Sequence, residues 1–153
     1  MSFVTEHLER RGVGYEVAEH PRAVTSMAEA RALGITADEV VKTVVLITDR
    51  GLALVVVPAS RRLDLRLARE AVGDHAARLA SEDELQRSFS ECELGALPPL
   101  GSLLGAPVFV DPEVLEHDTV IFAAGIQTQS IKARCADLFR GEEVQVIPVT
   151  RPD

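Results

Sequence analysis

The chain lacks the features that mark several special classes of protein. Its 153 residues include no tryptophan, only two cysteines and no apolar run long enough to cross a bilayer. The N-terminal stretch MSFVTEHLERRG carries charges where a signal peptide needs a hydrophobic segment. There is no internal repeat and no low-complexity linker. We therefore expect a cytoplasmic protein without a membrane partner, folded as a single domain over residues 1–153.

Cysteine and histidine spacing gives no sign of a metal site. Cys92 and Cys135 lie far apart, so we expect two reduced thiols and no disulfide. The histidines are scattered without metal spacing: His7, His20, His75 and His117. We expect no metal and no other cofactor.

The net charge of -8 argues against a protein that binds nucleic acid by bulk electrostatics. We expect no DNA partner, although a local basic patch is compatible with this charge.

Local patterns predict helices and strands in an irregular order. Helical patterns cover residues 3–11, 25–34, 61–73, 82–89 and 134–141. Strand patterns cover residues 15–21, 40–48, 52–59, 106–110, 119–125, 128–133 and 144–149. The runs at 40–48 and 52–59, joined by DRG, predict a hairpin buried on both faces. This order favours an α+β domain around a mixed sheet over a regular βαβ succession.

Two of the helices begin with a capping-box spacing. Ser26 and Glu29 have it in the second helix, and Ser81 and Glu84 have it in the fourth. Gly34 is placed to end the second helix.

The helix at 61–73 has apolar residues at four-residue intervals, which predicts one apolar face. Three arginines fall on a different face: Arg62, Arg66 and Arg69. A solvated face paired with carboxylates explains such a stripe, and contact with an RNA backbone is the alternative.

Lys42 is the most unusual residue in its setting. It shares a face with Val44 and Leu46 in a strand that is otherwise nearly all apolar, and lysine is rarely found inside proteins. In one interpretation its ammonium reaches solvent from the start of the strand. In the other it is directed into a cleft, where it binds a phosphate or stabilises developing negative charge.

Two glycine-containing segments are candidates for a ligand-binding surface. GALPPLG, residues 95–101, is either a surface turn or a rigid wall that presents backbone N–H groups to a carboxyl or ester oxygen. In FAAGIQTQS, Gly125 ends a buried strand, and Thr128 and Ser130 alternate outward with their hydroxyls. His20 precedes Pro21 in an extended loop and is a further candidate for a ligand contact.

Several motifs in one order resemble the YbaK/EbsC family, the freestanding relatives of the bacterial prolyl-tRNA synthetase editing domain. The motifs are VVKTVVLI, VVVPASRRLDL, the G-x-x-x-P-x-G loop GALPPLG, PVFVDPEVL and FAAGIQTQSIKARCADLF. The resemblance extends over residues 15–139.

This resemblance implies an α+β domain with a mixed, barrel-like sheet flanked by short helices. It also implies hydrolysis of the ester that joins a wrong amino acid to tRNA, with a ribose hydroxyl of the substrate activating the water. By family position, Lys42 is the lysine required for activity. By family position, Gly95, Pro99 and Gly101 form the substrate-binding loop and Gly125 lines the pocket. Thr128, Ser130 and His20 are the further substrate-binding candidates that the residue pattern gives.

The motifs leave the substrate open among small amino acids such as Ala, Cys, Ser and Thr, because pockets discriminate by one or two methylenes or a hydroxyl. The acidic charge suggests that a synthetase or an elongation factor shares tRNA selection. Two other functions remain: a binding module that keeps the fold without the chemistry, and a thiol enzyme using Cys92 or Cys135.

Overall fold

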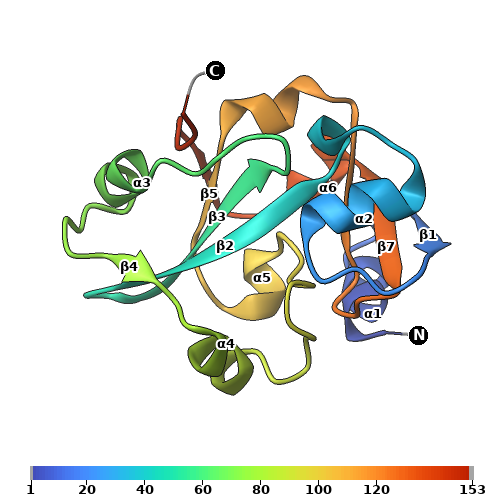
Figure 1. Cartoon of the computed structure of the whole chain (residues 1–153), viewed down its shortest axis with the longest axis horizontal. Coiled ribbons are helices and arrows are strands. Elements are labelled where there is room, and N and C mark those ends of the chain that lie inside the picture. Colours follow the sequence, from blue (N-terminus) through green and yellow to red (C-terminus); the bar gives the residue numbers. More distant parts are fainter. Residues whose placement is uncertain (1, 152–153) are drawn as a thin grey trace.

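Two β-sheets form the frame of the molecule (Figure 1). The computed structural model describes residues 2–151. Its strands are β1 (Tyr15–Glu19), β2 (Val41–Thr48), β3 (Gly51–Pro58), β4 (Arg78–Leu79), β5 (Val108–Val110), β6 (Thr119–Ala123), β7 (Gln129–Arg134) and β8 (Val144–Val146). The larger sheet has the order β4-β2-β3-β5-β8, and the smaller has the order β1-β7-β6.

The predicted α+β class with a mixed sheet and short flanking helices is confirmed, and the strands expected in one barrel-like sheet are divided between two sheets. In the larger sheet β2 pairs with β3 and β4 antiparallel, whereas β3, β5 and β8 run parallel. The smaller sheet is antiparallel. The sheets meet at a bridge between Val40 and Ile121, and the strands of residues 2–151 do not close into a barrel.

The helices are short and lie around these sheets. They are α1 (Phe3–Arg10), α2 (Ser26–Leu33), α3 (Leu65–Val72), α4 (Glu82–Ser88), α5 (Gly101–Leu104) and α6 (Cys135–Phe139), with 3-10 turns η1 (Ala37–Glu39) and η2 (Pro112–Glu116). In Figure 1, α3 lies beside the larger sheet, whereas α1 and α2 lie with the smaller one. Within the described residues, no helix is long and apolar enough to cross a membrane.

Each helix and strand expected from the sequence is present, and β4, α5 and the 3-10 turns are additional. One predicted cap is wrong. The N-cap of α2 is Thr25, whose hydroxyl accepts a hydrogen bond from the N–H of Ala28, so Ser26 is the first helical residue. Glu29 is buried instead of closing a capping box. The capping box of Ser81 in α4 is confirmed.

Helix α3 begins later than the sequence pattern predicts. Asp64 is its N-cap and accepts hydrogen bonds from two backbone N–H groups of the first turn. Leu63 and Arg62 therefore lie outside the helix. The residues that α3 buries are Ala68 and Val72.

Both faces of β3 are covered, as its continuous apolar sequence predicts. Leu54 and Val56 belong to the main core, together with residues of α1, β6 and β7. Val55 and Val57 face the other way and pack with α3. The hairpin thus holds β2 rigidly in register, with its other edge turned away from β3.

Candidate active site

A pocket of about 290 Å³ opens beside the start of β2. Its walls also come from residues 24–27 at the start of α2, from α4 and the residue after it, from residues 92–95, and from Ala59, Leu97 and Ala123. Leu85 of α4 and Phe89, its C-cap, make much of the lining apolar. Two residues of β2 with polar side chains, Lys42 and Thr43, also belong to the lining.

The backbone edge of β2 is open at this pocket. The Ala59 N–H donates to the Val40 carbonyl at 2.8 Å, and residues of an antiparallel ladder alternate between the two edges. Val41, Thr43 and Val45 therefore turn their N–H and C=O groups away from β3. The carbonyl of Val45 accepts a hydrogen bond from the N–H of Ala80, the residue that follows β4. Strand β4 itself pairs with the next part of β2. Ile121 of β6 bridges the same edge at Val40, so Thr43, which lies between this bridge and β4, presents its backbone groups to the pocket.

Thr43 also brings a buried hydroxyl without a partner. Its Oγ1 makes no hydrogen bond within residues 2–151. Leaving a buried polar group unpaired costs about 1–3 kcal/mol, so such groups call for an explanation. A polar group of a ligand in the pocket would satisfy this hydroxyl. Sequence reasoning missed Thr43, because a β-branched residue is ordinary in a strand.

Lys42 is half-buried and lines the same pocket. Burial lowers the pKa of its ammonium, and the positive charge of Arg62 lowers it further. Within the described chain the ammonium has no hydrogen bond and no carboxylate partner. One residue of the lining therefore carries a positive charge that no group of residues 2–151 neutralises.

Gly95 packs tightly against the loop before α2. Its φ is +76°, and a Cβ atom here would lie 1.8 Å from the carbonyl oxygen of Val24. Both residues line the pocket. Only glycine allows this approach without moving one of the two backbones.

Gly125 lies beside the same loop. Its N–H donates to the Ala96 carbonyl at 2.9 Å, and its carbonyl accepts from the Glu93 N–H at 2.8 Å. A φ of +85° fits glycine. The backbone of Gly125 therefore connects two loops, and its N–H is not free to orient a substrate.

Thr128 and His20 lie in a third connection. The His20 N–H donates to the Thr128 carbonyl at 3.0 Å, and the Ala23 N–H donates to the Gln127 carbonyl at 2.9 Å. The segments that contain His20, Gly95 and Gly125 therefore lie side by side, although they are far apart in the sequence.

The end of the GALPPLG segment lies away from the pocket. Pro99 is buried, and Gly101 begins α5 beside a second cavity of about 390 Å³. A Cβ atom on Gly101 would lie 2.5 Å from the Ala106 carbonyl oxygen and 2.6 Å from a methyl of Val108. Close packing accounts for glycine here.

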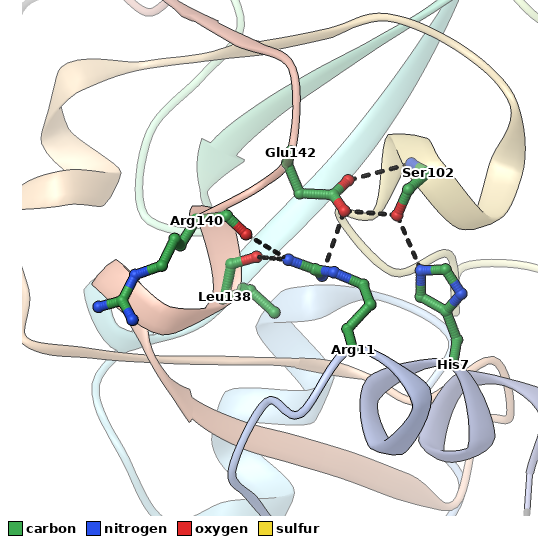
Figure 2. Close-up of polar contacts among 6 residues, drawn as sticks. All are labelled: His7, Arg11, Ser102, Leu138, Arg140 and Glu142. Atoms are coloured by element: carbon green, nitrogen blue, oxygen red, sulfur yellow. Dashed lines mark hydrogen bonds and ion pairs between the residues drawn. The ribbon is translucent and has the colours of Figure 1, made fainter.

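Figure 2 shows how α5 is held in place. The N–H and the hydroxyl of Ser102 both donate to the carboxylate of Glu142, and Nε2 of His7 lies 2.8 Å from the Ser102 hydroxyl. Arg11 pairs with the same carboxylate at 3.1 Å and donates to the carbonyls of Leu138 and Arg140. This network joins α1, α5 and the segment after α6, and so fixes the far end of the loop.

Ser130 does not point outward as the strand pattern suggested. It is fully buried, and its hydroxyl donates to Glu29 and lies 2.8 Å from Nε2 of His20. Thr128 is exposed.

The three arginines do not form one stripe. Arg69 donates from Nε to the Ala77 carbonyl at 2.7 Å. Arg66 pairs with Glu70 at 3.8 Å across one helical turn. Arg62 is exposed before α3 and is the one whose charge acts on Lys42.

The cysteines are poorly suited to nucleophilic chemistry. Cys92 lines the pocket, but burial raises the pKa of its thiol to about 11, and Glu91 adds to this effect. Burial also raises the pKa of Cys135. The thiolate is the reactive form, so these environments argue against a thiol enzyme. In residues 2–151 no three His, Cys, Asp or Glu side chains gather to hold a metal ion.

Known proteins share both sequence and fold with this chain. A family model described as the aminoacyl-tRNA editing domain matches residues 20–140. Proline--tRNA ligase of Shouchella clausii (strain KSM-K16) is 28% identical over 104 residues, which are 68% of this chain and 18% of the ligase. The chain thus spans only a small part of that relative's length.

Two solved structures are similar over nearly the whole chain. The crystal structure of a candidate trans-editing enzyme for prolyl tRNA synthetase has a TM-score of 0.84 and 27% identity, covering 99% of both chains. A scaffold protein from computational epitope grafting has a TM-score of 0.85 and 26% identity, covering 98% of this chain and 96% of the other.

Proposed function

This chain belongs to the aminoacyl-tRNA editing domain family, and on that premise we propose that it is a deacylase, which hydrolyses the ester of mischarged aminoacyl-tRNA. The observation that carries this proposal is the unpaired, half-buried ammonium of Lys42 beside an apolar pocket. An anionic ligand or a developing oxyanion would neutralise it. An aminoacyl-tRNA terminus offers both, in its phosphodiester and in the tetrahedral intermediate of ester hydrolysis.

Lys42 binds the terminal phosphate or stabilises the oxyanion in this mechanism. A fixed cation in a partly dehydrated site stabilises negative charge without reorganising. Arg62 lies close enough to influence Lys42 and is exposed, so we assign it a contact with the tRNA backbone. Arg66 and Arg69 have protein partners and contribute less.

Thr43 orients the ester carbonyl. Its N–H belongs to the open edge of β2, and its hydroxyl has no partner in the described chain. We assign these two donors to the carbonyl oxygen or the ribose of the substrate. Gly125, expected from the resemblance to bind substrate, cannot supply such a donor because its N–H is bonded to the Ala96 carbonyl.

In this mechanism a group of the substrate, and no protein side chain, activates the attacking water. Glu93 lines the pocket, but its Oε1 accepts a hydrogen bond from the Gln127 N–H at 2.7 Å. The thiol of Cys92 is held in its protonated form by its raised pKa. A ribose hydroxyl of tRNA, positioned next to the ester, then serves to activate the water, as the family resemblance implies.

The amino acid removed is small. A volume of about 290 Å³ must hold the aminoacyl group and part of the terminal ribose, and Phe89, Leu85 and Leu97 narrow its lining. A pocket of this kind excludes large side chains by sterics but separates Ala, Ser, Cys and Thr by only about 1–3 kcal/mol.

The test is hydrolysis of tRNAs charged with Ala, Cys, Ser, Thr and Pro by the wild-type protein. We expect hydrolysis of at least one tRNA charged with a small amino acid, and slower hydrolysis of the other charged tRNAs. Thr43→Val removes the hydroxyl while keeping the shape, and should lower turnover of the preferred substrate. If the folded protein hydrolyses none of the panel while a known deacylase hydrolyses it, the proposal fails. Binding of tRNA without turnover would then favour a binding module.

A further inference from the structure

The wall of the pocket formed by residues 24–27 belongs to a segment whose two ends meet at one hydroxyl. The segment runs from His20 to Glu29 and includes Val24, which packs against Gly95. At one end, Nε2 of His20 lies 2.8 Å from the Ser130 hydroxyl. At the other end, Glu29 accepts a hydrogen bond from the same hydroxyl. Ser130 is fully buried and Glu29 is 3% exposed, so water does not compete for these contacts.

The hydrogen atoms shared among His20, Ser130 and Glu29 can be counted. Nδ1 of His20 lies 2.8 Å from the Pro21 carbonyl oxygen, which only accepts, so Nδ1 carries a hydrogen. Ser130 has one hydroxyl hydrogen and cannot donate to both of its neighbours. Either a charged His20 donates to Ser130 and Ser130 donates to the Glu29 carboxylate, or a protonated Glu29 donates to Ser130 and Ser130 donates to a neutral His20.

Both arrangements contain one proton more than a neutral imidazole and a carboxylate together. When that proton is lost, the Ser130 hydroxyl still donates to Glu29, but Nε2 of His20 faces an oxygen with no hydrogen between them. A buried contact of two acceptors is unfavourable. The His20 end of the segment is then released.

We propose that Glu29 and Ser130 are positioning residues that hold the 20–29 segment against the pocket through a proton shared with His20. The effect on substrate rests on the deacylase function proposed above, whereas the effect on the segment does not. Residues 24–27 line the pocket, so release of the segment weakens substrate binding more than it slows the chemical step.

The surroundings agree with this assignment. Burial raises the pKa of Glu29, against the opposing effects of the Ser130 hydrogen bond and the charge of His20. Because its pKa is raised, Glu29 keeps its proton to a higher pH than an ordinary glutamate does, and loses it as the pH rises further. The charged groups next along these elements are exposed: Glu19 on β1, Arg31 on α2, Lys132 on β7 and Arg22 in the loop.

Amide hydrogen exchange of the 20–29 segment tests the proposal without any substrate. In the wild-type protein we expect the protection factors of the segment to fall about fivefold or more from a low to a high pH at which the protein stays folded, as the bond to His20 is lost. Glu29→Gln supplies an amide hydrogen to Ser130, which can donate to a neutral His20, so protection should stay high at both values. Ser130→Ala should be weakly protected at both. Glu16→Gln, an exposed change on β1, is the matched control and should behave as wild type.

Kinetics extend the test to the pocket. With a charged tRNA that the wild-type protein hydrolyses, Ser130→Ala should raise KM with a smaller change in kcat, and Glu29→Gln should remove the rise of KM at high pH. Equal pH responses of the segment in wild type and Glu29→Gln would overturn the proposal, even if Ser130→Ala does not fold. The expected exchange pattern without any deacylation would support the positioning role and overturn the proposed function.

Discussion

At the scale of single residues, Gly95 shows how closely two loops approach beside the pocket. Gly95→Ala places a methyl group 1.8 Å from the Val24 carbonyl oxygen and also strains a φ of +76°. We expect a loss of about 2–4 kcal/mol in the free energy of unfolding, measured by urea denaturation. Gly105→Ala is the control, since its φ is +73° but nothing lies within 4 Å of the new methyl. It should cost only about 1 kcal/mol. Equal losses would contradict the close packing of Gly95.

Lys42 gives a prediction about pH. Burial and then Arg62 lower its pKa, so the ammonium is lost at a lower pH than that of an ordinary lysine. Deacylation that needs this charge falls as pH rises through the lowered pKa. Arg62→Gln removes one of the two causes, and should move the alkaline limb of the pH profile to higher pH after spontaneous hydrolysis is subtracted.

Arg66→Gln is the control for this change, because Arg66 is exposed and paired with Glu70. It should leave the profile where it is. A profile that does not move in Arg62→Gln, or moves to lower pH, would show that the two charges do not interact as described.

Some of these residues could be found from sequence and others could not. Lys42 interrupts an apolar run, so its cost of burial is visible in the sequence. Thr43 fits a strand in every respect, and only the open edge of β2 makes its hydroxyl notable. Glu29 has the spacing of a capping residue, and its burial depends on the distant Ser130.

At the scale of elements, the first residue of α2 differs from the one that the sequence pattern predicts. Thr25 accepts the hydrogen bond from the Ala28 N–H, whereas Ser26 lies within the helix. Thr25→Ala should therefore lower the free energy of unfolding by about 1 kcal/mol, the usual value of an N-cap. Ser26→Ala should change the free energy of unfolding by only a few tenths of 1 kcal/mol, because alanine favours a helix. A larger loss for Ser26→Ala, measured by urea denaturation, would restore Ser26 as the cap.

Helices and strands with several apolar residues were predictable because burial imposes their periodicity. Helix α5 and strand β4 have four and two residues, too few to show a period. Strand β4 exists because Arg78 and Leu79 pair with β2, which lies far away in the sequence. The division of the strands into two sheets is likewise set by long-range pairing, which local patterns do not contain.

At the scale of the whole molecule, the acidic net charge opposes binding of tRNA, the substrate of the proposed function. The net charge of -8 repels a polyanion, and most arginines discussed above are bound to protein groups. Lys42 and Arg62 are thus a local exception beside the pocket. If the proposed deacylase function holds, this charge distribution predicts that the protein binds the terminus of tRNA more strongly than its body.

The measurement that tests the central claim most directly compares the two lysines of the chain. Lys42 lines the pocket, whereas Lys132 is exposed on β7, so Lys42→Ala and Lys132→Ala remove the same charge at different places. Single-turnover hydrolysis of the preferred mischarged tRNA should slow about a hundredfold or more in Lys42→Ala, the scale of a lost oxyanion contact, and stay near the wild-type rate in Lys132→Ala. Equal rates in a folded Lys42→Ala protein and the wild type would contradict the account.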